Sequence, residues 1–225
     1  MTTQTDIERA RFNMVEQQIR PWDVLDQQVL DLLFELRRED FVLPQFRSLA
    51  FFDMEIPLAA NAGEDERMLA PKLEARMLQA LSVKPSDRVL EIGTGSGYMT
   101  ALLARRAAHV TSVEINPEFS TQAAQRLAAH DIRNITLETG DGARGWARNA
   151  PYDAIVLTGS TPVLDPAFQA SLNAGGRLLA IVGDAPAMTA QLINCEAPGV
   201  FRSTGLFETC VPPLRNAPQP KRFEF

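Results

Sequence analysis

The order of apolar and polar positions divides this chain into a helical front part and a longer part in which strands and helices alternate. Short apolar runs, most of them closed by a glycine or an acidic residue, predict the strands. The predicted strands are Arg88–Ile92, His109–Val113, Asn134–Thr139, Tyr152–Leu157 and Arg177–Val182, and the predicted helices between them are Gly97–Ala107, Pro117–Ala129 and Asp165–Leu172. This alternation predicts an α/β fold with a doubly wound, mostly parallel sheet.

The pattern changes near the end of the chain. Met188–Glu196 and Val200–Val211 are rich in β-forming residues, and only Ala-Pro-Gly separates them. Because no helix lies between them, they predict an antiparallel hairpin at the edge of the sheet. The residues after Pro212 include further prolines and are expected to be extended.

The front part has helical spacing and no strand–helix alternation. The segment 6–19 predicts a helix whose apolar face includes Phe12 and Val15, and Asp26 is expected to cap a second helix. These apolar faces need the main sheet to cover them. We therefore expect one domain over residues 1–225, composed of a helical extension (1–57), a parallel α/β core (71–183) and an edge hairpin (188–214).

The most informative stretch is Val89–Gly97, an apolar run that meets an acid at Glu91 and then carries glycines at Gly93, Gly95 and Gly97. A strand that ends in glycines and leads into a helix forms a floor for a nucleotide-like ligand, because glycine permits unusual backbone angles and close approach. The dinucleotide fingerprint Gly-x-Gly-x-x-Gly is absent, since its third glycine is missing in both registers.

The acids near this turn favour S-adenosylmethionine as the ligand. It has no phosphate but carries an amino group and a sulfonium, and Glu91 would attract these cations. Glu114 ends the second strand, about 20 residues after Gly93, where an acid can accept hydrogen bonds from ribose hydroxyls. Asp141 ends the third strand, where it can face the adenine amino group, and Gly142 allows close approach.

These side chains are expected to converge, because the carboxyl ends of parallel strands meet at one edge of a sheet. Thr94 in the glycine turn, Ile115 after the second strand and Thr158 after the fourth strand complete the predicted cofactor site.

Composition narrows the possible partners. A net charge of −6 and a pI of about 5.1 argue against nucleic acid as the main partner. No apolar run approaches the ~20 residues that span a bilayer and the start of the chain has no apolar signal core, so a cytoplasmic protein is expected. Cys195 and Cys210 lack metal-ligand spacing, so we expect no metal site and interpret both as small buried residues.

With these residues in view, the chain resembles the protein-L-isoaspartate O-methyltransferases over nearly its whole length. The segments that carry the resemblance are Met14-Val15-Glu16, Arg38-Glu39-Asp40-Phe41-Val42, Arg88-Val89-Leu90-Glu91-Ile92-Gly93-Thr94-Gly95-Ser96-Gly97-Tyr98, Gly140-Asp141-Gly142, Pro151-Tyr152-Asp153-Ala154-Ile155, Ala174-Gly175-Gly176-Arg177-Leu178 and Val211-Pro212-Pro213-Leu214. The resemblance implies a Rossmann-like methyltransferase sheet. It also implies methyl transfer from S-adenosylmethionine to the carboxylate of an isoaspartyl residue, as a repair of damaged protein.

One segment departs from the family pattern. Aligned on Pro71, the family's Thr-Ile-Ser block falls on Arg67, Met68 and Leu69, so Leu69 replaces the serine that helps to bind substrate and cofactor. The acidic run 64–66 lies just upstream and would repel a carboxylate substrate. The Arg67 guanidinium could instead bind such a carboxylate through two hydrogen bonds.

Two further functions stay open at this point. One is a related methyltransferase with an uncharged or phenolic acceptor, and the other is a cofactor-binding protein without transferase activity. Transfer to a carboxylate needs positioning and desolvation rather than a general base. Transfer to a hydroxyl would need a base, for which Asp53 is the candidate.

Overall fold

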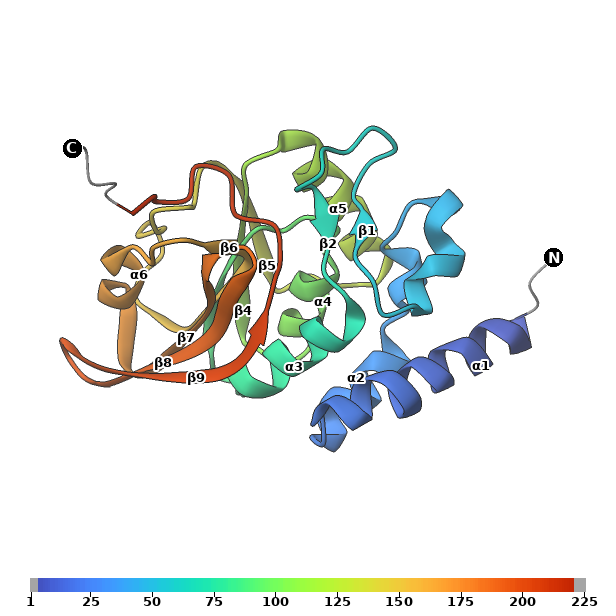
Figure 1. The fold of residues 1–225 in the computed structure, drawn as a ribbon, viewed down its shortest axis with the longest axis horizontal. Helices are drawn as coiled ribbons and strands as arrows, with labels where there is room; N and C mark the ends of the chain where they lie inside the picture. Colours follow the sequence, from blue (N-terminus) through green and yellow to red (C-terminus); the bar gives the residue numbers. More distant parts are fainter. Residues whose placement is uncertain (1–3, 221–225) are drawn as a thin grey trace.

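A seven-stranded sheet forms the centre of the molecule, which a computed structural model describes for residues 4–220 (Figure 1). The strands are β3 (Arg88–Ile92), β4 (His109–Glu114), β5 (Ile135–Thr139), β6 (Tyr152–Thr161), β7 (Leu172–Asp184), β8 (Ala187–Ala197) and β9 (Val200–Thr209), and their order is β5-β4-β3-β6-β7-β8-β9. The first five in this order pair in parallel, and β8 and β9 add antiparallel. The predicted sheet and edge hairpin are therefore confirmed. Residues 1–3 and 221–225 of the predicted domain lie outside the described residues.

The helices of the α/β part begin where local sequence signals place them. They are α3 (Pro71–Leu81), α4 (Tyr98–Ala104), α5 (Pro117–Ala129) and α6 (Pro166–Ala170). Proline suits the first turn of a helix, because its missing N–H has no partner there in any case. The Asn116 side chain accepts the N–H of Glu118 at 2.9 Å, and the Asp165 side chain accepts the N–H of Ala167 at 2.9 Å, which caps α5 and α6.

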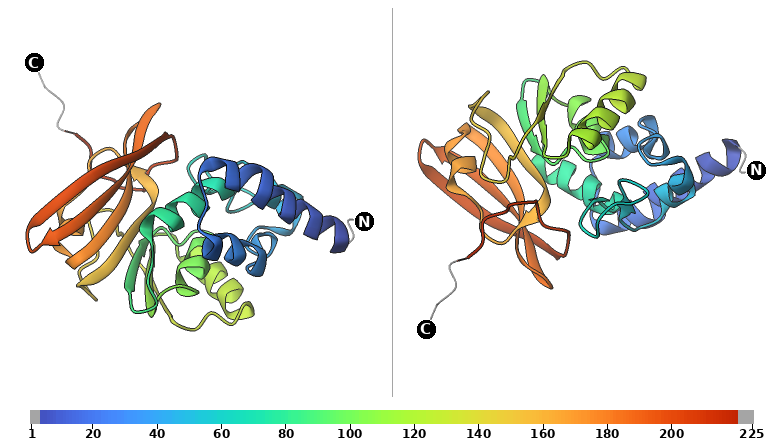
Figure 2. Two further views of the ribbon diagram at one scale, coloured as in Figure 1. Left: turned by 90° about the horizontal axis from the view of Figure 1, so that it is seen from below. Right: turned by 90° about the horizontal axis from the view of Figure 1, so that it is seen from above.

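The N-terminal segment is helical and packs against α3, and its Trp22 ring contacts Phe207 of β9 with 6.4 Å between the centroids (Figure 2). It comprises α1 (Gln4–Asn13), a π-helical stretch (Met14–Ile19), α2 (Gln27–Glu35) and 3₁₀ segments (Arg20–Trp22, Arg38–Asp40, Pro44–Phe51). Asp26 caps α2 by accepting the N–H of Gln28 at 2.8 Å, as predicted. Met14, Val15 and Ile19 are fully buried in the same apolar cluster as residues of α3 and α4.

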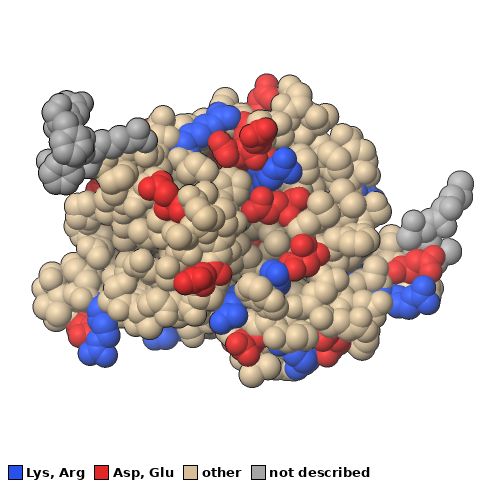
Figure 3. Space-filling view, in the orientation of Figure 1, with Lys and Arg blue, Asp and Glu red and all other residues tan. Residues whose placement is uncertain are grey.

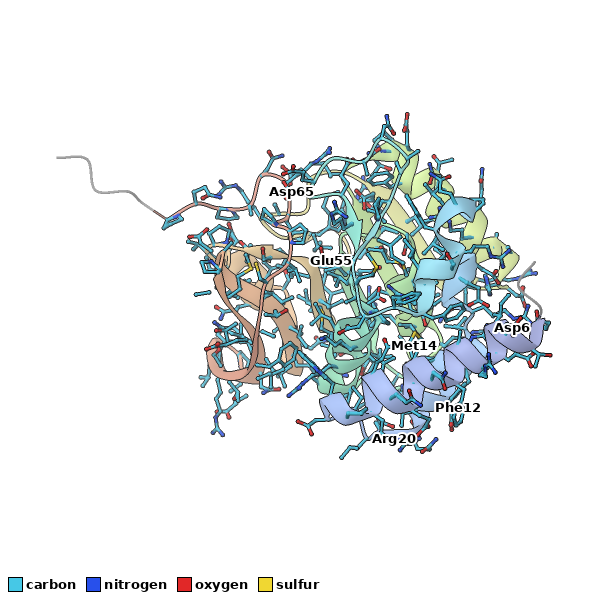
Figure 4. The ribbon with its side chains drawn as sticks, turned by 45° about the vertical axis from the view of Figure 1, so that its right-hand side comes forward. Asp6, Phe12, Met14, Arg20, Glu55 and Asp65 are labelled. Carbon is cyan, nitrogen blue, oxygen red and sulfur yellow. The ribbon has the colours of Figure 1, made fainter. Side chains whose placement is uncertain are left out.

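Phe12 does not belong to the buried face, and its prediction as such was wrong. Its side chain is 54% exposed and contacts Phe34, with 6.4 Å between the ring centroids. The chain passes from α-helical to π-helical spacing at Met14, which rotates the following apolar face relative to α1. Figure 4 accordingly shows Phe12 on the outer side of the helix.

β6 is longer than predicted because the C-terminal segment pairs with its end. The strand continues past Leu157 to Thr161. The N–H of Ser160 donates to the carbonyl of Pro212 at 2.9 Å, and the N–H of Leu214 donates to the carbonyl of Ser160 at 2.8 Å. These bonds join the extended tail to the sheet.

Two further differences concern short elements. β7 starts at Leu172, the last residue of the segment predicted as a helix and before the predicted strand start at Arg177, and the added residues lie beside a register shift of β6. A separate antiparallel pair, β1 (Ile56–Pro57) and β2 (Arg67–Met68), was not predicted. It frames the loop 58–66.

Within residues 4–220, no helix is long and apolar enough to cross a bilayer. In the same range, no group of three or more His, Cys, Asp or Glu side chains could hold a metal ion. Cys195 is buried as predicted, but Cys210 is exposed because it follows the end of β9.

Candidate active site

The glycine turn follows β3 and has a left-handed backbone. Gly93, Gly95 and Gly97 have φ values of 96°, 51° and 86°, which residues with a Cβ rarely adopt. A Cβ at Gly93 would lie 2.3 Å from the Thr158 hydroxyl. That hydroxyl is 2.9 Å from the carbonyl oxygen of Ile92 and 2.6 Å from that of Gly93, so Thr158 fixes the turn.

A cavity opens over this turn at the carboxyl ends of the parallel strands. Its wall is formed by the glycine turn, the residues after β4 and β5, the end of β6, the loop 58–69, α3, α4 and the C-terminal segment. The strand order reverses between β3 and β6, which lie side by side. Ligands of α/β sheets bind at such a switch point.

Glu114 lies in the cavity wall and connects two strand ends. One of its carboxylate oxygens accepts the N–H of Gly95 at 2.8 Å, and the other accepts the N–H of Asn116 at 2.9 Å. Each oxygen keeps a further lone pair for a ligand hydroxyl. Ile115 and Asn116, which follow it, line the same cavity.

Asp141 and Gly142 also line the cavity, next to Ala143. Asp141 accepts the N–H of Ala143 at 3.0 Å and the side-chain amide of Asn216 at 2.9 Å. A Cβ at Gly142 would lie 2.8 Å from the Ile92 side chain, so only glycine fits there.

Thr94 lines the cavity, but Gly97 does not. The Thr94 hydroxyl lies 2.5 Å from that of Ser112 in β4, which ties the turn to the sheet. A Cβ at Gly97 would be 3.1 Å from Ala123 of α5. Gly97 therefore serves the packing of α4 against α5.

The structure places Glu91 behind the turn, outside the cavity wall. It is fully buried, and one carboxylate oxygen accepts hydrogen bonds from Ser112 at 2.6 Å and Thr100 at 2.5 Å. Burial raises the pKa of Glu91 to about 8, against the effect of these hydrogen bonds. Glu91 is thus not in position to touch a ligand in the cavity.

The altered segment Arg67, Met68 and Leu69 forms one wall of the cavity, together with Asp65 and Glu66. The Arg67 guanidinium donates to the carbonyl of Glu64 at 2.9 Å. Met68 and Leu69 are 4% exposed each and supply an apolar surface. Figure 4 shows Asp65 at the top of this loop, near the C-terminal segment.

The C-terminal segment closes another side of the cavity. Pro212, Pro213, Leu214 and Arg215 belong to the wall, and Arg215 forms an ion pair with Glu66 across it. Acidic and basic side chains gather in this upper part of the molecule (Figure 3). No sequence pattern predicts this contact, because nothing in an extended proline-containing tail specifies which surface it covers.

Asp53 is not part of the cavity wall. Its carboxylate pairs with the Lys72 ammonium at 2.5 Å. In this arrangement it does not face the residues of the glycine turn, so the structure does not bring it together with the other predicted site residues.

Sequence reasoning also missed Glu74 and Met99, which line the cavity from α3 and α4. Met99 resembles any other apolar residue of its helix. Glu74 could have been noticed, because it interrupts the apolar face formed by Leu73, Met77 and Leu78.

The chain is similar in sequence to known methyltransferases. The model of a family described as Protein-L-isoaspartate(D-aspartate) O-methyltransferase (PCMT) matches residues 9–211. A curated relative, Protein-L-isoaspartate O-methyltransferase 1 of Anaeromyxobacter sp. (strain Fw109-5), is 39% identical over 196 residues, which cover 86% of this chain and 91% of the relative.

Solved structures share the fold. A protein-L-isoaspartate O-methyltransferase superposes with a TM-score of 0.76 and 24% identity, over 92% of this chain and 65% of that one. A PCMT protein from Plasmodium falciparum, in complex with S-adenosyl-L-homocysteine, superposes with a TM-score of 0.73 and 16% identity, over 92% of this chain and 97% of that one. At these identities the likeness is evidence for the fold alone.

Proposed function

Because the chain belongs to the protein-L-isoaspartate(D-aspartate) O-methyltransferase family, we propose that it methylates isoaspartyl carboxylates in damaged proteins. The family was predicted from the motifs, and with it the class of enzyme, an S-adenosylmethionine-dependent O-methyltransferase. Both are confirmed by the family match. Our proposal concerns the acceptor and the site residues, and it places the reaction in the cytoplasm.

The cavity over the glycine turn is the observation that carries the proposal. Gly93 and Gly142 line this cavity without a side chain, so bare backbone faces it and a flat ligand can approach closely. Glu114 is suited to the ribose hydroxyls, and Asp141 to the adenine amino group. When bound, the cofactor supplies a methyl group already activated by the positive sulfur.

The remaining cavity wall is suited to positioning and to exclusion of water. Met68, Leu69 and Met99 are buried apolar side chains beside the turn. A carboxylate acceptor is already a nucleophile, so no general base is needed and desolvation assists the transfer. Arg67 is the cavity-lining guanidinium nearest in sequence to Leu69, and we assign it to hold the acceptor carboxylate.

The test is methyl transfer from labelled cofactor to an isoaspartyl peptide, with the matching aspartyl peptide as control. We expect label in the isoaspartyl peptide only. Asp141→Ala should abolish binding of S-adenosylhomocysteine in calorimetry. Arg67→Met should raise the KM for peptide about tenfold, the loss of one charge-assisted contact, and leave cofactor affinity unchanged.

A second candidate acceptor is favoured by the cavity wall itself. Leu69 supplies no hydroxyl, and the carboxylates of Asp65 and Glu66 lie in the wall. These features suit an uncharged acceptor better than an anionic one. Intact cofactor binding without methylation of the isoaspartyl peptide would contradict the first function and direct the search to uncharged acceptors.

A further inference from the structure

Glu74 is a buried carboxylate that faces the cavity and has no assigned role. It lies in the first turn of α3 and is 3% exposed. It belongs to the same wall as Thr94, Ser96 and Leu69. A charged group in such a place is costly unless it has partners.

Arg38 holds Glu74 in place. The Arg38 side chain is 1% exposed and pairs with oxygen Oε2 of Glu74. It also donates to the carbonyl of Leu69 at 2.6 Å and to the carbonyl of Ala50 at 3.1 Å. These bonds fix the guanidinium on three segments, so the carboxylate has a defined orientation.

The second oxygen of Glu74, Oε1, has no hydrogen-bond partner among residues 4–220. Burial raises the pKa of Glu74 to about 7, and the Arg38 charge opposes this effect. A cation that enters the cavity would stabilise the ionised carboxylate and complete its hydrogen bonding.

We propose that Glu74 binds the α-ammonium group of the methionine part of S-adenosylmethionine, the contact predicted from the sequence for Glu91. The inference rests on the proposed function, since it takes that cofactor as the ligand. Glu91 is excluded by its position behind the turn, whereas Glu74 reaches the cavity.

The chemistry favours the ammonium over the two other cations that could enter. An ammonium donates hydrogen bonds, which Oε1 can accept, whereas a sulfonium has no hydrogen to donate. A basic side chain of a peptide substrate would be expected nearer the mouth, where Asp65 and Glu66 lie in the loop. Glu74 is instead only 3% exposed, and Arg38 connects it to the carbonyl of Leu69.

The test compares ligands that differ in one group, by calorimetry and without any acceptor. For Glu74→Gln we expect about a tenfold or greater loss of affinity for both S-adenosylmethionine and S-adenosylhomocysteine, the size of a lost charged hydrogen bond. The analogue of S-adenosylhomocysteine that lacks the amino group should bind the variant and the wild type equally well.

Glu39→Gln is the matched control. Glu39 is 3% exposed and pairs with Arg11, so the variant breaks a similar buried ion pair, but it does not line the cavity. Its affinity for S-adenosylhomocysteine should equal that of the wild type. The double variant Arg38→Met, Glu74→Leu replaces the pair by apolar side chains, which a folded core tolerates, and should show the same loss as Glu74→Gln.

Other results would overturn the inference, and two of them would show which group Glu74 contacts instead of the ammonium. A loss for S-adenosylmethionine alone would point to the sulfonium, and a raised peptide KM with unchanged cofactor affinity would point to the substrate. Equal affinities of Glu74→Gln and wild type for S-adenosylhomocysteine would sink the inference and leave the proposed function intact. No binding of S-adenosylhomocysteine by the wild type would overturn both.

Discussion

The carboxyl group of Glu91 lies beneath the glycine turn, where burial raises its pKa to about 8. Two hydroxyls bond one of its oxygens, while Oε1 is buried without a partner among the described residues. The folded chain therefore keeps a proton on this group to a higher pH than the unfolded chain, whose ordinary value is 4.5. The glycine turn, which we propose to bind the cofactor, therefore lies above a carboxyl group that titrates.

Glu91→Gln should reduce the dependence of stability on pH. Between pH 4.5 and about 8 the folded protein binds more protons at this site than the unfolded chain, so its contribution to stability is fully present below pH 4.5 and is lost as pH rises through about 8. A pKa that differs by one between the folded and the unfolded chain corresponds to about 1.4 kcal/mol of stability. Urea unfolding at pH 5 and pH 8 should show a smaller loss for the variant. Glu74 is present in both proteins, so equal losses would contradict the assignment to Glu91.

Gly93→Ala should destabilise the protein by roughly 2–4 kcal/mol and weaken cofactor binding. The added Cβ meets the Thr158 hydroxyl at 2.3 Å in addition to the strain of a φ of 96°. Gly199→Ala is the control, because Gly199 has a φ of 78° and nothing within 4 Å of a Cβ. Unfolding in urea should give a loss of about 1 kcal/mol for the control. Similar losses for both variants would mean that backbone strain alone decides the effect.

At the scale of elements, the cavity is closed by two segments that share no sheet. The loop 58–66 connects β1 to β2, and the C-terminal segment is hydrogen-bonded to β6. Arg215 and Glu66 pair between them, and Asn216 bonds to Asp141. We therefore expect access to the cavity to depend on the partly exposed ion pair of Arg215 and Glu66.

Arg215→Met should speed the release of S-adenosylhomocysteine about two- to fivefold at low salt, the size expected for a partly exposed pair. At 1 M salt the variant and the wild type should release it at nearly equal rates, because the pair is screened. Arg202→Met is the control, since its pair with Glu196 lies in the β8–β9 hairpin. Stopped-flow measurement of release checks this, and a difference that persists at high salt would mean that packing rather than charge closes the cavity.

The elements that the sequence predicted well are those whose formation is determined by residues within or next to the element itself. The strands β3 to β5 and the helix start at Pro117 follow from apolar runs, proline and a cap. The extension of β6, the β1–β2 pair and the role of Arg215 depend on segments that meet only in the folded chain. The burial of Glu91 behind the turn and the place of Glu74 in the cavity wall have the same origin, because Glu91 bonds to Ser112 and Glu74 pairs with Arg38, partners that are distant in the sequence.

For the molecule as a whole, the N-terminal helices and the sheet share one apolar core. Met14 and Leu30 of the N-terminal part belong to a single buried cluster with Val89 of β3 and Val156 of β6. The buried pair of Arg11 and Glu39 ties α1 to the segment that carries Arg38. We therefore expect the N-terminal part to unfold together with the sheet.

Two single-tryptophan variants can test this cooperativity. Trp146→Phe leaves Trp22, which packs near Lys72 and Phe207, and Trp22→Phe leaves Trp146 beside Gly140 in the α/β part. The fluorescence transitions of both variants should coincide with loss of helix signal in urea, as for a two-state protein. An earlier transition reported by Trp22 would show that the N-terminal part unfolds independently.

The pairing of the C-terminal segment with β6 also determines when the cavity is completed during synthesis of the chain. Pro212 to Arg215 leave the ribosome after every other part of the cavity wall. A nascent chain that stops at residue 211 lacks this side of the cavity and the bonds of Ser160 to Pro212 and Leu214. The complete cavity wall therefore exists only after translation has passed Arg215, and we expect cofactor binding to support folding only from that point.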